Sequence, residues 1–463
     1  MNRNYRTIAL IIASAMFMEQ LDATVLATAL PTMARDFGVT APHMSVALTS
    51  YLLSLAIFIP ASGWVADRYG ARTVFGSAIL VFTAGSVLCA QAPSLSWLVA
   101  ARLLQGLGGA MMMPVGRLVL LRSVRREDMV SAMSWLLVPA MMGPVVGPPL
   151  GGVIVTYLDW RWIFYINLPI GLLGMALTAR YIANIKGDDR TPLDVAGLLL
   201  SGVSLGCLFF GLELISRDSS GALTLALLAV GLVAGGFYIR HAARHKAPIL
   251  QLSLMKVQSF RLSVIAGSLT RITQGAHPFL LPLMLQLGFG LSPAQSGSIV
   301  LATALGSVLM KAFAPALLRR YGFRRSLMVN GLISSGGYAL CAAFRPDWSF
   351  LVIFGILVAC GFFMSFQFTG YNTVAYAEIE SPQMSAATSF YTTFQQLMLS
   401  TGICVAALSL HLSMAMFGHV HPTLADFSSA FLMVTAISAA ALVWNRQFDP
   451  AVGTDISGHA LED

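Results

Sequence analysis

The chain has 463 residues, of which 57% are apolar and only 10% are charged, with a mean hydropathy of +0.75 and a formal net charge of +8. An ordinary soluble domain has about a quarter of its residues charged, so this chain lacks the polar surface that soluble domains of this total length would need. Its basic residues are spread over short loops between apolar runs, which argues against a nucleic-acid partner. The composition therefore predicts an all-α polytopic membrane protein embedded in a lipid bilayer.

Apolar windows of about 20 residues, the length that crosses a bilayer as a helix, occur fourteen times. The predicted spans are residues 7–29, 45–66, 73–92, 96–118, 129–156, 162–183, 194–213, 221–240, 262–286, 295–316, 326–343, 350–373, 384–410 and 424–445. With a cytoplasmic N-terminus, 22 of the 28 Lys and Arg residues lie in or beside cytoplasmic loops. This bias predicts that both termini are cytoplasmic.

A short charged turn follows the second span and contains the candidate hinge residues. Two of them are glycines, which would allow close packing and a sharp reversal of the chain. The hinge residues are Gly63, Asp67, Arg68, Gly70 and Arg72.

The same turn returns in the second half of the chain. Arg68-Tyr-Gly-Ala-Arg72 is echoed 252 residues later by Arg320-Tyr-Gly-Phe-Arg324, which indicates a duplicated membrane protein. Six crossings with short loops need roughly 200 residues, so the excess predicts two helices inserted between the halves. The expected units are residues 1–190 (a six-helix bundle), 191–245 (two inserted helices), 246–448 (an interfacial helix, then a second six-helix bundle) and 449–463 (a disordered polar tail).

Two acidic residues lie inside the first span. Glu19 and Asp22 are three residues apart on one helix face, and an acid at membrane depth is costly unless it faces protein or water. Arg102 lies within the fourth span, roughly 10 Å below the outer surface, which is also the depth of Asp22. We expect these two side chains to pair and assign Asp22, Glu19 and Arg102 to proton coupling. Purely structural hydrogen bonds or ion pairs are the alternative.

Glycines recur every four residues in the fifth span and would give it a smooth surface for helix contact. Neighbouring prolines should bend this helix. The residues of this motif are Gly143, Pro144, Gly147, Pro148 and Gly151. At the start of the sixth span, the aromatic residues beside Arg161 in the segment 160–171 indicate an anchor in the outer interface.

Polar side chains in other spans are candidates for a substrate cavity. Arg271 lies near the midplane of its span, where a guanidinium suits an organic anion better than a lipophilic cation; a helix-capping or ion-pairing role is the alternative. The remaining candidates for the cavity are Gln105, His277, Gln367, Asn372 and Gln396. The five cysteines and the His-x-His pair at 419–421 lack a convincing metal-ligand spacing, so no metal or other cofactor is expected.

Together these stretches resemble the major facilitator superfamily, and within it the fourteen-span branch of drug:proton antiporters. The most specific parts are the hinge at 63–72, the segment from Arg102 to Gly109 and the Gly-Pro repeat at 143–152. Within that branch the chain is most similar to transporters of the MdtD type, through the segments 114–117, 289–293 and 306–311.

The resemblance implies two six-helix bundles around a central cavity and alternating access by rocking of one bundle against the other. It also implies that Asp67 latches the outward-facing state through Arg72 and the start of a C-terminal helix. The second copy of the turn departs from this pattern, with Arg319 in place of Asp67 and Pro315 in place of Gly63, so only the first copy should act as a latch.

The expected function is proton-coupled efflux of small organic molecules by a monomer in the plasma (inner) membrane of a bacterium. No enzyme is expected, because the polar residues within the spans are too sparse for a catalytic cluster, and no phosphate-binding loop is present. One alternative is specific export of an organic anion, such as a carboxylate, or of a metal chelate. Another is a sensory or assembly protein that has kept the transporter fold without transporting.

Overall fold

The computed structural model describes residues 5–124, 128–186, 192–215, 221–245, 247–380 and 383–459, and the regular elements in these ranges are helical. The first half contains α1 (Tyr5–Asp36), η1 (Ala41–Met44), α2 (Ser45–Phe58), η2 (Ile59–Ala61), α3 (Ser62–Tyr69), α4 (Ala71–Ala90), α5 (Leu95–Ser123), α6 (Met129–Tyr157), α7 (Trp162–Tyr165) and α8 (Asn167–Tyr181). Two helices follow, α9 (Val195–Ile215) and α10 (Gly221–Ala242). The second half contains η4 (Leu252–Lys256), α11 (Gln258–Leu283), η5 (Met284–Gly288), α12 (Pro293–Cys341), α13 (Phe350–Val374), α14 (Met384–Phe417), α15 (Leu424–Ala439), α16 (Ala441–Asn445) and α17 (Thr454–Ser457).

Twelve helical segments of the described chain are long and apolar enough to cross a membrane. One of them, α12, has 49 residues and contains a non-helical residue, Gly322, at φ 66°. A straight helix of that length would measure about 74 Å, more than twice the roughly 30 Å of a bilayer core, so Gly322 divides it into two helices. In addition, α11 has 26 residues but lies outside the twelve segments, because Arg271, Gln274 and His277 lower its hydropathy.

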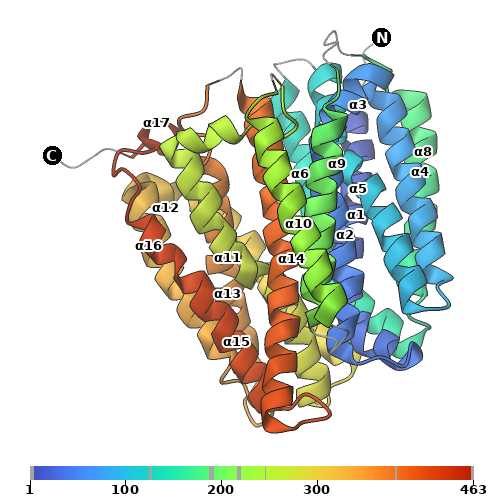
Figure 1. Cartoon of the computed structure of the whole chain (residues 1–463), viewed down its shortest axis with the longest axis vertical. Helices are drawn as coiled ribbons and strands as arrows, with labels where there is room; N and C mark the ends of the chain where they lie inside the picture. Colours follow the sequence, from blue (N-terminus) through green and yellow to red (C-terminus); the bar gives the residue numbers. More distant parts are fainter. Residues whose placement is uncertain are drawn as a thin grey trace.

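The helices form two bundles, α1–α8 and α11–α16, which lie side by side (Figure 1). The bundles meet along two seams, α2 against α14 and α6 against α12. Helix α9 lies over the first seam, where Phe209 packs with Leu53 of α2 and Cys404 of α14. The two helices between the halves therefore cover a joint between the bundles.

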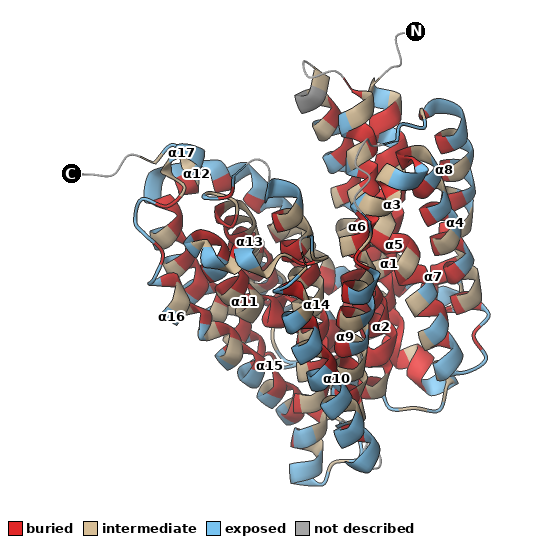
Figure 2. Ribbon diagram, turned by 45° about the horizontal axis from the view of Figure 1, so that its top comes forward, coloured by how far each residue is buried: buried red, intermediate tan, exposed pale blue. Residues whose placement is uncertain are grey.

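The apolar core is continuous between the bundles at one end only. Leu30 and Trp160 of the first bundle share a cluster with Phe279 and Phe427 of the second. At the end that carries both termini, the clusters around Phe75 and around Phe323 are separate. Figure 2 shows the two halves diverging toward this end. The protein is thus closed at the end opposite the termini.

The hinge turn has the predicted sharp reversal. Gly70 ends α3 with φ 94° and lies against the side chain of Asn184, so a β-carbon at this position would clash. The second copy of the turn has its own positive-φ glycine, Gly322. The expectation that Gly63 permits close packing is wrong for this conformation, because the space beside its Cα is open.

Two other segments pack on the protein. The segment 247–256 contains the short helix η4, and its Leu250 and Leu254 are buried in the cluster of Phe260 and Tyr391, while its position relative to a leaflet stays a prediction. The tail from residue 449 to 459 is also structured, since Val452 packs in the cluster of Phe323. In both cases apolar residues find a protein surface to cover, which stabilises the segment more than exposure would. The rest of the tail lies outside the described residues.

Candidate functional site

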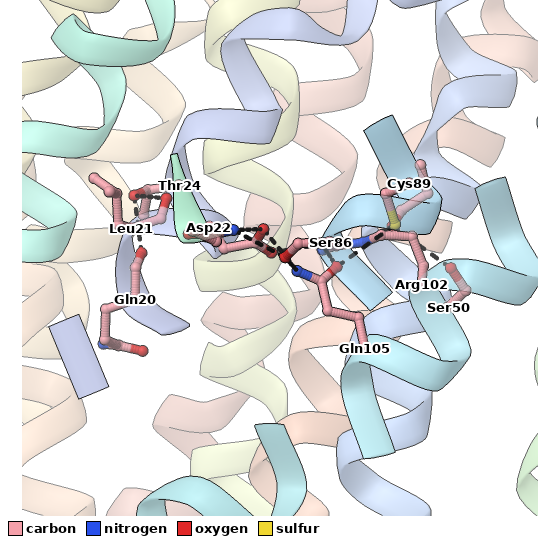
Figure 3. Close-up of polar contacts among 11 residues, drawn as sticks. Gln20, Leu21, Asp22, Thr24, Ser50, Ser86, Cys89, Arg102 and Gln105 are labelled. Atoms are coloured by element: carbon pink, nitrogen blue, oxygen red, sulfur yellow. Dashed lines mark hydrogen bonds and ion pairs between the residues drawn. The ribbon is translucent and has the colours of Figure 1, made fainter. Parts of the chain in front are cut away.

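The carboxylate of Asp22 lies at the centre of a buried polar network inside the first bundle (Figure 3). Its Oδ2 accepts a hydrogen bond of 2.5 Å from Nη1 of Arg102, and its Oδ1 accepts one of 2.9 Å from Nε2 of Gln105. The side chains of Asp22 and Arg102 are 1% and 0% exposed. The predicted pairing of Asp22 with Arg102 is therefore present, and it is shielded from water in this conformation.

Besides its ion pair, Arg102 is held by two residues of α2 and one of its own helix, α5. Nε donates to the carbonyl oxygen of Ala47 over 3.0 Å, Nη1 also donates to Oε1 of Gln105 over 2.6 Å, and Cζ lies 4.5 Å from the centre of the Tyr51 ring. Nη2 is buried without a hydrogen-bond partner. A guanidinium so enclosed depends on the nearby carboxylate for charge compensation.

Two further residues of the network were not predicted. Asn167, at the start of α8, donates to Oδ1 of Asp22 over 3.0 Å and to Oγ of Ser86 over 3.1 Å. Gln105 also reaches Ser86, over 2.8 Å. Asn167 belongs to the aromatic segment 160–171. An amide side chain within this apolar run was the feature of the sequence that could have marked Asn167 as part of a polar network. The same segment contains Trp160, which is buried and donates to Asp36, so this tryptophan is not the interfacial anchor that we expected.

Glu19 lies on the same helix but outside this network. It is 5% exposed, and its Oε2 has no hydrogen-bond partner. Arg117 of α5 is exposed. Three further buried carboxylates, Asp194, Glu213 and Asp426, were missed because each lies close to the end of its predicted span.

The glycine stripe of α6 lies directly against α1. Gly143 faces the turn of Gln20 and Leu21, Gly147 faces Thr24, and Gly151 faces Val25 and Thr28, so a side chain at any of these positions would push α1 away. Helix α6 is continuous through its four prolines, among them Pro144 and Pro148. The motif thus sets the position of the helix that carries Glu19 and Asp22.

The opposite side of α6 contacts the second bundle. The carbonyl oxygen of Pro148 lies against Gly297 of α12, and Gly152 lies against the backbone of Pro293. These contacts form part of the closed end of the protein. One helix therefore touches both the acid-bearing helix and the opposite bundle.

Arg271 occupies an aromatic pocket in the second bundle. Its Nη2 donates to the hydroxyl of Tyr391 over 2.9 Å, and Cζ lies 4.7 Å from the Tyr391 ring centre and 5.6 Å from that of Phe368. The residue is 2% exposed, and its Nε has no hydrogen-bond partner. Within the described part of the chain, no carboxylate forms an ion pair with Arg271.

The other predicted cavity residues are mostly not free to meet a ligand. Gln105 belongs to the Asp22 network. His277 is 2% exposed and packs edge-on against Tyr338 and Phe431 in the second bundle. Gln367 is also 2% exposed. Each of these three side chains is enclosed within its own bundle in this conformation, and its assignment to the cavity stays a prediction.

Gln367 is part of a second polar network, between α12, α13 and α16. It accepts a hydrogen bond of 2.7 Å from Asn330 and donates over 3.2 Å to Tyr371, whose hydroxyl donates over 2.7 Å to Asn445. Asn372 is half-buried and donates to the backbone carbonyl of Phe368. Gln396 is half-buried on α14 and remains a cavity candidate.

The hinge aspartate has a partner different from the one expected. Oδ1 of Asp67 accepts a hydrogen bond of 2.5 Å from Nη2 of Arg122 on α5, and not from Arg72. Arg122 also donates to the carbonyl oxygen of Ile185 over 3.4 Å. In this conformation Asp67 therefore ties the hinge to its own bundle, and among the described residues it has no hydrogen bond or ion pair with the second bundle.

The fold and the buried ion pair define a polytopic helical membrane protein with two related halves. The Major Facilitator Superfamily profile matches residues 12–403 and 264–453. The "Probable transport protein HsrA" of Haemophilus influenzae is 37% identical over 442 residues, which cover 95% of each chain. The "Putative multidrug resistance protein MdtD" of Escherichia coli O6:H1 is 36% identical over 94% of this chain and 91% of its own length.

The fold is also similar to that of solved transporters with low sequence identity. The peptide transporter PepTSo has a TM-score of 0.68 at 13% identity, covering 95% of this chain and 96% of its own. The nucleoside transporter NupG has a TM-score of 0.62 at 15% identity, covering 96% of this chain and 100% of its own. This chain belongs to the major facilitator superfamily. It is a transporter and not an enzyme, and it is homologous to proteins named for multidrug resistance.

Proposed function

We propose that this chain is a proton-coupled antiporter that exports small organic molecules across the bacterial plasma membrane as a monomer. The observation that carries the proposal is the Asp22–Arg102 pair, two opposite charges 0–1% exposed inside one bundle. Such a pair costs desolvation energy and is weak support for stability alone. The pair suits proton coupling, because a conformational change that separated Asp22 from Arg102 would raise the proton affinity of Asp22 and favour the protonated acid.

The chain would cross the membrane fourteen times, with both termini in the cytoplasm. The twelve apolar segments become thirteen when α12 is divided at Gly322, and α11 supplies the fourteenth. Because the cores of the two bundles join only at the end opposite the termini, the proposed orientation makes this conformation inward-facing. The seams along α2–α14 and α6–α12 support alternating access by rocking of the bundles.

The two carboxylates of α1 have different surroundings, which supports different roles. Asp22 is hydrogen-bonded by three side chains and would exchange its proton only when the Arg102 contact opens. Glu19 has one oxygen without a hydrogen-bond partner and lies three residues before Asp22 on α1. In this scheme Asp22 couples proton binding to conformation, and Glu19 passes the proton between Asp22 and the space between the halves.

The test is uptake into proteoliposomes driven by an imposed pH gradient, screened with cationic, neutral and anionic compounds. We expect the gradient to drive accumulation of at least one compound, and addition of that compound to release protons. If no compound accumulates and none releases protons, the transport proposal fails and a sensory or assembly role on the same fold replaces it.

A second candidate, export of an organic anion, is favoured by Arg271. Its guanidinium is buried, has a free Nε and has no carboxylate partner among the described residues. Substitution to Ala should weaken the apparent affinity for an anionic substrate about 10- to 100-fold, as expected for one lost charged hydrogen bond, with little effect on a neutral one. Efficient export of a quaternary ammonium dye, unchanged by Arg271→Ala, would contradict this candidate.

A further inference from the structure

A pocket lies at the C-terminal end of α10, on the pair of helices between the bundles. Its volume is about 420 Å³, and it is lined by Leu200, Phe237, Arg240, His241, Arg244 and His245. Arg240 lies in the last turn of α10 and Arg244 in the turn that follows the helix, and both line the pocket. Both are exposed, and neither guanidinium has a hydrogen bond or an ion pair with a described residue. The pocket therefore presents two uncompensated cations.

The nearest acid, Asp194, is occupied by structural contacts. Oδ1 accepts a hydrogen bond of 2.8 Å from the backbone N–H of Gly197 and lies 2.7 Å from Nε2 of His241, while Oδ2 accepts one of 3.1 Å from the backbone N–H of Ile249. Burial by itself would raise the pKa of Asp194, but these hydrogen bonds outweigh it and the pKa is lowered. Asp194 thus stays ionised, and it forms no ion pair with either of the two arginines.

A metal ion is the other ligand to consider here. Asp194, His241 and His245 could each offer one atom, and these atoms lie within 4.8 Å of one another. However, the Asp194 oxygens already accept three hydrogen bonds, and Nδ1 of His245 accepts one of 3.3 Å from Ala247. The two arginines of the same pocket would also repel a cation. The charge distribution favours an anion.

The helix surface around the pocket is apolar and exposed. Phe237 is 59% exposed, and farther along the outward faces of α9 and α10 Leu199 is 62% exposed and Leu232 is 67% exposed. In a spanning pair of helices these residues contact acyl chains. A ligand in this place would meet two guanidinium groups at its polar end and an apolar helix surface below them.

We propose that this pocket binds an anionic phospholipid, with the phosphate between Arg240 and Arg244 and the glycerol and upper acyl chain against Phe237 and Leu200. The planar guanidinium matches phosphate oxygens in a bidentate geometry, and anionic lipids concentrate at the cytoplasmic leaflet, where the proposed orientation places this end of α10. The site does not require transport. Since α9 lies over the α2–α14 seam, a bound lipid would anchor the inserted pair beside that seam.

The test is native mass spectrometry of the purified full chain titrated with phosphatidylglycerol or with phosphatidylcholine. We expect Arg240→Gln/Arg244→Gln to weaken phosphatidylglycerol binding about thirtyfold, since each arginine near an anionic headgroup contributes a several-fold effect. The matched control is Arg180→Gln/Arg261→Gln, which removes the same charge from exposed positions near the ends of α8 and α11. The control should change binding less than twofold.

Other outcomes would overturn the proposal. Equal losses in the two double variants would indicate unspecific attraction to the basic surface. If inorganic phosphate competes for the pocket as effectively as the lipid does, the pocket is an anion site that does not recognise the lipid. The pocket would instead be a metal site if two results were found together. The wild type would bind zinc and lose this binding in His241→Gln/His245→Gln, and the arginine variant would bind phosphatidylglycerol as well as the wild type does.

Discussion

Replacement of Asp22 by Asn tests whether the buried ion pair serves coupling, stability or both. The substitution keeps the shape but removes the charge that faces Arg102 at 2.5 Å. Arg102 is fully buried and would be left without a carboxylate in contact. Breaking a buried pair from one side costs about 3–5 kcal/mol, a large share of the roughly 5–15 kcal/mol that stabilises a typical protein. We therefore expect Asp22→Asn to lower stability and to abolish gradient-driven transport.

A double variant separates the two effects. Asp22→Asn/Arg102→Gln removes both charges, so no uncompensated guanidinium remains and much of the lost stability should return. Transport should still be absent, because the titrating acid is gone. Asp159→Asn is the matched control, since Asp159 is exposed, forms a 3.3 Å pair with Arg161 and should cost less than about 1 kcal/mol.

The assays are unfolding in detergent, followed by tryptophan fluorescence, and pH-driven uptake into proteoliposomes. Concentration of a substrate against its gradient by Asp22→Asn would refute the coupling role. A loss of stability below about 1 kcal/mol would refute the claim that Arg102 depends on Asp22. If the double variant is as unstable as the sum of the single variants, the two residues do not interact energetically.

Three other substitutions test the rest of the site. A methyl group at Gly152 would overlap the backbone of Pro293 at the closed end, so Gly152→Ala should shift the protein toward the conformation that is open at this end. Cysteine labelling should then change at both ends of the protein, and unchanged labelling would contradict this contact. Asp67→Asn breaks the partly exposed pair with Arg122, so it should cost no more than about 1 kcal/mol of stability while slowing turnover in proteoliposomes; normal turnover would argue against a hinge role. Gln367→Leu should destabilise the protein by about 1–3 kcal/mol by leaving buried partners unpaired with substrate affinity unchanged, and reduced affinity would return this residue to the cavity.

The approximate positions of the spans and the pairing of Asp22 with Arg102 were predictable from the sequence. Span prediction needs only a count of consecutive apolar residues; the predicted span 350–373 agrees with α13 (Phe350–Val374) to one residue, whereas the predicted span 7–29 ends seven residues before α1 (Tyr5–Asp36) does. The pair was predictable because two opposite charges at equal depth have few other partners in a membrane. Gly70 was also predictable, since a reversal between two helices favours a residue that tolerates positive φ.

Tertiary structure decided the direction in which each polar side chain points. Gln367 lies on a helix with apolar residues all round, so no amphipathic pattern showed which face meets another bundle and which faces inward. Asn167 and Asp22 are 145 residues apart, and Arg122 and Asp67 are 55 apart. Hydropathy fixes how deep a residue lies along its helix, whereas the rotation of that helix and its neighbours depends on packing between distant segments.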